Sequence, residues 1–379
     1  MNLPSHRLEG PPEAPVVVLL NSLGTSGAMW DPQVAALLPY RRVLRVEHPG
    51  HGGTPRPDPL PGSVAELGQG LVGLLDHLGI ERCSVVGLSL GGMVALWLAS
   101  EHPGRVDRLV LACTAAQLPP AEAWLERAAR SRSEGPAALA PMLVERWFTP
   151  EGRASRPELA EWVTGMLAAC DPEGYAACCE AIAAFDHRER LGAIEAPTLV
   201  LTGAEDPVTP PATALALAEA IPGAALAVLP HAAHLAPVEQ PRRTTDALLD
   251  HLLGSPAERG EAVRRAVLGD AHVDASTAAS DPAQRAFVDL VTRTTWGEVW
   301  VRPALDRPTR SAVTLAVLAV LGRLHELPLH VRGALRNGLR PDQVIEVLLH
   351  AGAYGGVPAA NAAVAVAREV LAEEGRLNG

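Results

Sequence analysis

The sequence predicts an α/β domain with a mostly parallel sheet and a helical cap, over residues 1–253, followed by an all-α domain over 259–379. Two observations predict this division. Short apolar runs typical of buried strands alternate with helical patterns in the first part, whereas no such alternation appears after residue 257. A Gly-Ser-Pro break at 254–256 ends the first part, and we expect a linker at 254–258. The length of 379 residues is enough for two cores.

The apolar runs predict the strands and the intervening patterns predict the helices. The expected strands are 16–20, 42–46, 83–86, 109–112, 198–202 and 225–229. Between 117 and 196 helical patterns follow one another without a convincing strand, so we expect a cap inserted over the sheet. A last helix is expected from 241 to 253.

The all-α part shows a run of helical patterns, which we expect at 285–294, 309–323, 329–337, 341–354 and 359–373. The stretch 312–321 is apolar nearly all round and therefore requires burial on every side. A small helical domain rarely provides that much burial, so we expect a homo-oligomer formed through this domain.

Composition excludes several classes of function. The sequence has no lysine, so its 32 basic residues are all arginine, and Schiff-base chemistry with a lysine amine is excluded. The net charge of −11 argues against nucleic acid or anionic membranes as partners, whereas small anionic substrates need only a local arginine. The five cysteines show no C-x-x-C spacing, which indicates buried thiols rather than a disulfide framework or a metal site. No membrane-length apolar run or leader appears, so we expect a cytoplasmic protein.

The first chemical motif is Gly87-Leu88-Ser89-Leu90-Gly91, which joins an expected strand to an expected helix. Such a G-x-S-x-G turn is a nucleophile elbow, in which the serine hydroxyl is exposed on a strained turn. Gly87 and Gly91 fit because the turn leaves no room for side chains two residues from the serine. An ordinary strand-to-helix turn remains the alternative.

A serine nucleophile needs a histidine base and an orienting carboxylate, which follow it in the order acid, then histidine. Asp206 follows the strand expected to end at 202, and His234 follows the strand ending at 229. Their neighbours Glu205 and His231 compete for the same roles. We favour Asp206, which precedes a proline, and His234, which stands five residues before a Glu-x-Pro sequence, because both match the pattern of the family named below.

These motifs together resemble the α/β-hydrolase superfamily over residues 1–253. Asn-Ser-Leu-Gly-Thr at 21–25 stands where many members carry His-Gly-x. The resemblance implies an oxyanion hole made by the backbone N–H groups of Leu23 and Leu90. In the turn Glu-His-Pro-Gly-His-Gly at 47–52, proline replaces the arginine of the family pattern, so we interpret His48 and His51 as loop-shaping residues.

Within the superfamily, the sequences at 21–25 and 87–93 and Arg-Trp-Phe-Thr-Pro at 146–150 resemble β-ketoadipate enol-lactone hydrolases. The resemblance implies that Ser89 attacks the lactone carbonyl, that His234 takes its proton, and that the leaving group departs as an enolate. Trp147 would then line the substrate pocket. A tryptophan on an amphipathic helix is more often a core residue, which is the alternative for Trp147.

The second motif is His-Glu-Leu-Pro-Leu-His at 325–330. It differs from the zinc motif H-E-x-x-H by one extra residue, and five helical positions rotate by roughly 140°, so a zinc site is not expected. Glu326 and His330 are four residues apart and would share a helix face as a proton-transfer pair. An exposed surface pair is the alternative.

Residues 260–372 resemble γ-carboxymuconolactone decarboxylases, through 326–339 and 346–361. Thiol proteins of related fold carry C-x-x-C where this chain has Arg323 and Glu326, so their chemistry is absent. The resemblance implies decarboxylation without a cofactor, because the lactone carbonyl accepts the electrons. His330 and Glu326 would then be the acid pair.

We expect Arg307 or Arg310 to bind the substrate carboxylates, and His350 and Tyr354 are further candidates for this site.

The two resemblances support each other, because the product of such a decarboxylase is the substrate of such a hydrolase. The sequence therefore predicts two consecutive steps of aromatic catabolism, in the β-ketoadipate pathway of protocatechuate degradation, on one chain. The alternatives are an esterase or lactonase with a non-catalytic helical oligomerisation domain, and a binding protein of hydrolase fold. The serine, acid and histidine together weigh against the binding protein.

Overall fold

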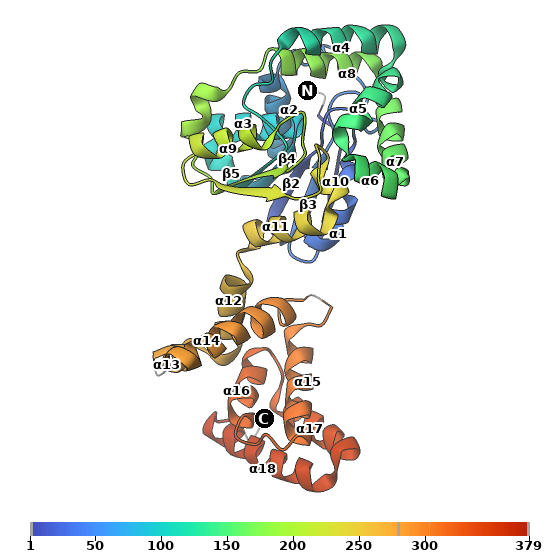
Figure 1. The fold of residues 1–379 in the computed structure, drawn as a ribbon. Helices are drawn as coiled ribbons and strands as arrows, with labels where there is room; N and C mark the ends of the chain where they lie inside the picture. The colour runs from blue at the N-terminus through green and yellow to red at the C-terminus, as the bar shows by residue number, and fades with distance from the viewer. Residues whose placement is uncertain (1–2, 279–280, 303, 377–379) are drawn as a thin grey trace. The chain divides into compact units, whose positions relative to one another are not determined.

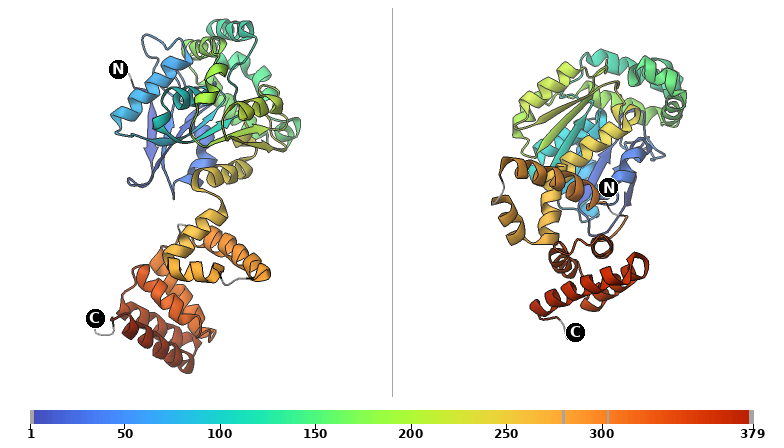
Figure 2. Two further views of the ribbon diagram at one scale, coloured as in Figure 1. Left: turned by 90° about the vertical axis from the view of Figure 1, so that its left-hand side faces the viewer. Right: turned by 60° about the horizontal axis from the view of Figure 1, so that its bottom comes forward.

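The computed structural model describes residues 3–278, 281–302 and 304–376. The chain divides into two compact units, 1–252 and 253–379 (Figures 1 and 2). The division falls at the end of helix α11, Pro241–Leu253. The break after it is shorter than the expected linker, because Pro256 is the first residue of a helix whose Ser255 N-cap forms a capping box with Glu258.

The first unit is built on a seven-stranded sheet of order β1-β3-β2-β4-β5-β6-β7. All neighbouring strands are parallel except β1, which runs antiparallel to β3. Strand β1 was not predicted from the sequence, because its four residues are exposed or half-buried and lack an apolar run. Its Glu9 forms an ion pair with Arg45 of β3. The strands are β1 His6–Glu9, β2 Val16–Leu20, β3 Arg42–Val46, β4 Cys83–Leu88, β5 Val106–Ala112, β6 Thr198–Gly203 and β7 Ala225–Leu229.

Helices flank this sheet, and the inserted segment forms an entirely helical cap apart from one isolated bridge between Gln117 and Asp186 (Figure 1). The cap helices are α4 Ala121–Glu134, α5 Ala140–Trp147, α6 Pro150–Ser155, α7 Pro157–Ala168 and α8 Pro172–Ala183. The others are α1 Asp31–Leu37, α2 Val64–His77, α3 Leu90–Glu101, α9 Pro211–Ala220, α10 Ala236–Glu239 and α11 Pro241–Leu253. Short 3₁₀ turns lie at Gly27–Trp30, Pro103–Arg105, Pro136–Leu139 and Arg188–Ala193.

The core of this unit lies at the junction of β4 and α3. All six residues of β4 are buried, and α3 is buried from Leu90 to Ser100. A helix that is apolar all round requires such burial. The turn between β4 and α3 is therefore held on both sides by close-packed structure.

The second unit is all-α, as expected. Its helices are α12 Pro256–Leu268, α13 Asp270–Ala278, α14 Pro282–Val291, α15 Arg307–Val320, α16 Leu327–Arg336, α17 Pro341–Gly355 and α18 Val357–Glu373. The helix expected to run to residue 294 ends at 291 and continues as a π-helix, Thr292–Val299. This turn approaches α12 so closely that a Cβ at Gly297 would lie 1.8 Å from the Pro256 carbonyl oxygen.

The apolar helix α15 is buried on one side only within the single chain. Leu315 and Ala319 are fully buried in the cluster formed with α16, α17 and α18. Val313, Val317 and Leu321, however, expose 52%, 48% and 64% of their surface. Among the described residues, no helix is both long enough and apolar enough to cross a membrane.

Candidate active sites

The turn from β4 to α3 places Ser89 in a strained conformation with φ 54° and ψ −114°. A non-glycine residue rarely adopts such a backbone conformation, and such residues gather at functional sites. Two hydrogen bonds hold the turn: the Ser89 N–H donates to the Ala112 carbonyl (3.0 Å), and the Thr114 hydroxyl donates to the Ser89 carbonyl (2.7 Å). The end of β5 therefore supports the elbow.

The two glycines of the motif are sterically required. A Cβ at Gly87 would lie 2.2 Å from the Gly91 carbonyl oxygen, and a Cβ at Gly91 would lie 2.4 Å from the Leu20 carbonyl oxygen. Contacts this short do not occur between real atoms, so any side chain forces the backbone to shift. The lack of room for side chains that the sequence predicts at Gly87 and Gly91 is therefore present in the structure.

Ser89, His234 and Asp206 form one hydrogen-bonded chain. His234 Nε2 lies 3.0 Å from the Ser89 hydroxyl, and His234 Nδ1 lies 2.9 Å from Asp206 Oδ2. All three residues are at least 95% buried. The competing residues Glu205 and His231 are exposed, so the structure brings together the acid and the histidine favoured from the sequence.

The Asp206 carboxylate is held in its ionised form. The N–H groups of Val208 and Thr209 donate to Oδ1 at 2.8 and 3.0 Å, and the Thr209 hydroxyl donates to Oδ2 at 2.6 Å. Burial raises the pKa of Asp206, but the charge of His234 and the hydrogen bonds from His234 and Thr209 outweigh it and lower the pKa below its ordinary value. An ionised acid fixes the histidine with its Nδ1 proton toward the carboxylate.

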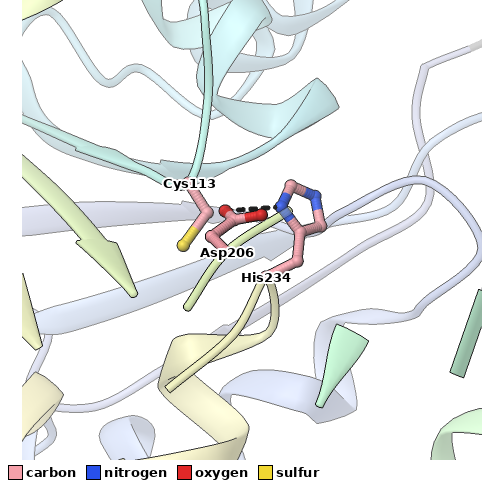
Figure 3. A group of neighbouring side chains, drawn as sticks. All are labelled: Cys113, Asp206 and His234. Carbon is pink, nitrogen blue, oxygen red and sulfur yellow. Dashed lines mark hydrogen bonds and ion pairs between the residues drawn. The ribbon is translucent and has the colours of Figure 1, made fainter. Parts of the chain in front are cut away.

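Cys113 lies beside this pair, at the end of β5, and the sequence analysis gave it no role (Figure 3). Its sulfur and the ligand atoms of Asp206 and His234 all lie within 4.8 Å of one another. Burial raises the pKa of the Cys113 thiol, as does the negative charge of Asp206. A protonated thiol and an aspartate already bonded to several donors are poor metal ligands, so we assign no metal here.

The loop that carries Leu23 is held by His48 and His51. His51 Nε2 accepts the Gly24 N–H at 3.0 Å, and its Nδ1 donates to the Pro49 carbonyl at 2.9 Å. His48 Nε2 donates to the Asn21 carbonyl at 2.8 Å. Burial lowers the pKa of His51 to about 4 and that of His48 to about 3, so both rings are neutral near pH 7.

These contacts correspond to the loop-shaping interpretation of His48 and His51. Leu90 is the first residue of α3, where N–H groups have no acceptor within the helix. Among the described residues, no acceptor takes the N–H of Leu23 or Leu90. Both groups are available to a developing oxyanion.

The cap covers this loop with Trp147, Leu167 and Tyr175. A Cβ at Gly24 would lie 2.8 Å from Leu167, 3.2 Å from Tyr175 and 3.4 Å from Trp147. Trp147 is buried, and its carbonyl accepts the Leu235 N–H at 2.9 Å. The structure therefore places Trp147 next to the candidate oxyanion hole.

A second buried serine–histidine contact lies elsewhere in this unit. Ser100 Oγ and His187 Nε2 are 2.6 Å apart, and the hydroxyl also donates to the Trp97 carbonyl. Ser100 lies near the opposite end of α3 from Ser89. Among the described residues, no carboxylate is hydrogen-bonded to the His187 ring, and we assign this pair a structural role that links the end of the cap to α3.

In the helical unit, no hydrogen bond or ion pair joins the side chains of Glu326 and His330 among the described residues, although the charge of Glu326 acts on His330 in the direction that raises its pKa. Glu326 instead forms an ion pair with the exposed His325, with 3.4 Å between His325 Nε2 and Glu326 Oε1. Glu326 is the N-cap of α16, the residue immediately before the helix begins. Only the backbone joins the two residues, through His330 N–H to the Glu326 carbonyl.

His330 is half-buried on α16. Burial lowers its pKa, the Glu326 charge opposes this, and the nearby His272 of α13, which the sequence analysis did not single out, adds to the lowering. His330 is therefore neutral near pH 7, with a carboxylate close enough to affect its protonation.

The other candidates of this unit are spread over two helices. His350 and Tyr354 pack ring against ring at 5.2 Å on α17, and both are exposed. Arg307 is exposed at the start of α15, and Arg310 donates to the Arg302 carbonyl at 2.6 Å. Among the described residues, no hydrogen bond or ion pair joins any of these four to His330.

Comparison with known proteins identifies both units. Residues 15–241 match the model of the alpha/beta hydrolase fold family. The chain belongs to this family. Residues 285–369 match the carboxymuconolactone decarboxylase family.

The two units of the chain are similar to two different proteins. The first is 39% identical over 233 residues to 3-oxoadipate enol-lactonase 2 of Acinetobacter baylyi, covering 62% of this chain and 86% of that protein. The second is 44% identical over 118 residues to the 4-carboxymuconolactone decarboxylase of the same organism, covering 31% of this chain and 88% of that protein. The enol-lactonase structure from Burkholderia xenovorans LB400 is 38% identical, with a TM-score of 0.63, and covers 66% of this chain and 96% of that one.

Proposed function

We propose that this chain is a bifunctional enzyme of the β-ketoadipate pathway. Its helical unit decarboxylates 4-carboxymuconolactone to 3-oxoadipate enol-lactone, and its hydrolase unit converts the enol-lactone to 3-oxoadipate. The observation that carries the proposal is the buried chain of hydrogen bonds from Ser89 through His234 to Asp206. The names of the two relatives, each matching one unit, support the substrates.

In the hydrolase unit, the Ser89 hydroxyl attacks the lactone carbonyl while His234 Nε2 takes its proton. Asp206 stabilises the imidazolium that forms, and the N–H groups of Leu23 and Leu90 stabilise the oxyanion. One such donor typically contributes about 10²- to 10³-fold in rate. The ring opens to an enolate, which takes the proton from His234 and becomes a ketone. Water, activated by His234, then releases 3-oxoadipate from Ser89.

In the helical unit, loss of carbon dioxide leaves an electron pair that the lactone carbonyl receives as a dienolate. The protonated form of His330 delivers one proton to carbon; burial disfavours this form, and the negative charge of Glu326 partly offsets that effect. Arg307 and Arg310 are the proposed anchors for the substrate carboxylates, with His350 and Tyr354 as further binding residues. The reaction as proposed uses no cofactor and no metal.

Assembly and location belong to the same proposal. The exposed apolar side of α15 supports a homo-oligomer formed through the helical unit, because a monomer would leave Val313, Val317 and Leu321 in water. We place the enzyme in the cytoplasm, with small anionic lactones as its partners.

The decarboxylase half is tested with His330→Ala. We expect this variant to lose carbon dioxide release from 4-carboxymuconolactone while keeping its oligomeric mass and its hydrolysis of added enol-lactone. If carbon dioxide release persists, His330 is not the proton donor. If the wild type releases none, the helical unit is an assembly domain attached to a serine esterase or lactonase, which is the alternative function.

A further inference from the structure

Glu239 is a buried carboxylate that the proposed reaction does not use. It lies at the end of α10, five residues after His234, and exposes 1% of its surface. Its Oε1 accepts the N–H and the hydroxyl of Thr149, at 2.8 and 2.6 Å. Its Oε2 accepts the Ala233 N–H at 2.8 Å. One side chain therefore joins the cap to the residue before His234.

A second contact joins the same two segments on the other side of the histidine. The Leu235 N–H donates to the carbonyl of Trp147, which is two residues before Thr149. The residues on both sides of His234 are therefore connected to the cap segment 147–149. The Leu235 N–H is hydrogen-bonded to that segment directly, and the Ala233 N–H is connected to it through Glu239. The Glu239 carbonyl also accepts Arg156 Nη2 at 2.6 Å, which adds a third connection to the cap.

We propose that Glu239 is a positioning residue that couples the cap to His234, so that the cap segment beside the substrate determines where the histidine lies. The proposal rests on the catalytic role proposed for His234. Because Trp147 lies against the oxyanion loop, a substrate that seats this segment also aligns the base with Ser89. Placement of the base within fractions of an ångström strongly affects rate.

The chemistry of the site requires a carboxylate. Three donors converge on the two oxygens of Glu239, and an amide offers only one oxygen and adds its own N–H groups. Glu239→Gln therefore leaves a buried donor without an acceptor, on the cap side or on the histidine side. The cap also makes room for the carboxylate, because a Cβ at Gly152 would lie 2.0 Å from Oε1.

The test uses the full-length chain and two readouts. One is kcat and KM for enol-lactone hydrolysis. The other is the rate at which Ser89 reacts with a fluorophosphonate, which reports activation of the serine without the natural substrate. For Glu239→Gln and Gly152→Ala we expect kcat and the labelling rate to fall about 10- to 100-fold, as displacement of the base by up to about 1 Å implies, with KM changed about threefold or less.

Matched controls separate positioning from general destabilisation. Ser131→Ala removes a buried hydrogen bond within the cap, from the Ser131 hydroxyl to the Pro172 carbonyl, without touching the histidine loop. Glu205→Gln removes an exposed carboxylate next to Asp206. Both should keep kcat and labelling within about twofold. Thr149→Ser should preserve the rates, whereas Thr149→Val, which loses the hydroxyl, should lower them.

The outcomes are distinct. The proposal is overturned if Glu239→Gln and Gly152→Ala are labelled at the wild-type rate. It is also overturned if the labelling rate of Ser131→Ala falls as far as that of those two variants. If Glu239→Gln does not fold, Gly152→Ala and the two Thr149 variants decide the question. A wild type that reacts with the fluorophosphonate but does not hydrolyse the enol-lactone refutes the proposed substrate, while the labelling rates still test the role of Glu239.

Discussion

Replacing His51 by glutamine should remove a large part of the acid sensitivity of the hydrolase unit. His51 is fully buried, and burial lowers its pKa from 6.5 to about 4. The unfolded chain therefore takes up a proton at this residue at a higher pH than the folded chain does. The stabilisation from a neutral His51 is complete above pH 6.5 and is lost as the pH falls to 4.

The shift gives the size of the effect. A difference of this size between the folded and unfolded pKa corresponds to about 3 kcal/mol of unfolding free energy lost between pH 7 and pH 4. Glutamine can accept the Gly24 N–H and donate to the Pro49 carbonyl as the ring does, but it does not titrate. The free-energy difference between wild type and His51→Gln should therefore shrink by about 3 kcal/mol over this pH range.

The assay is urea denaturation followed by tryptophan fluorescence at a series of pH values, in which the transition of interest is identified at pH 7 as the one that abolishes fluorophosphonate labelling of Ser89. That transition reports the hydrolase unit and ignores the helical one. Groups other than His48 that titrate in this range are common to both proteins and cancel in the difference. The pKa of His48, which the His51 charge helps to lower, is about 3, so this ring stays neutral in the folded wild type down to pH 4. Parallel stability curves for the two proteins from pH 7 to pH 4 would refute the reasoning, because they would show that His51 takes up its proton equally in both states.

Two further predictions follow from close contacts and exposed surface. Gly91→Ala places a methyl group against the Leu20 carbonyl, so it should destabilise the elbow by about 1–3 kcal/mol and reduce enol-lactone hydrolysis while carbon dioxide release is unchanged; equal loss of both activities would contradict this. Val317→Asp puts a charge in the middle of the exposed side of α15, so it should lower the mass measured by sedimentation equilibrium. An unchanged mass would show that this side of α15 is not a subunit interface.

The sequence was sufficient to predict the elbow because its geometry is local, and to predict its partners because each follows a recognisable strand. Gly87 and Gly91 are dictated by the turn itself, and Asp206 and His234 follow strands that are clear apolar runs. The edge strand β1 was missed because its four residues, two exposed and two half-buried, carry no apolar run.

Contacts between distant segments were beyond pattern reasoning. Helical spacing predicted Glu326 and His330 as a pair; the direct contact of the Glu326 carboxylate is with His325, and its charge acts on His330 without a hydrogen bond between the two side chains. The Glu-x-Pro sequence was used only to choose His234. That its glutamate, Glu239, bonds to Thr149 of the cap, 90 residues away, could not be read from the sequence. The position of Cys113 beside Asp206 and His234 could not be predicted from the sequence. It follows only from the fold, which places the end of β5 next to the loop that carries Asp206.

The most direct measurement follows 4-carboxymuconolactone with the wild-type chain and with Ser89→Ala, recording carbon dioxide and 3-oxoadipate together. We expect the wild type to form both products. Ser89→Ala should release carbon dioxide at the wild-type rate and stop at the enol-lactone. Absence of carbon dioxide with both proteins would contradict the decarboxylase half, and formation of 3-oxoadipate by Ser89→Ala at the wild-type rate would contradict the hydrolase half.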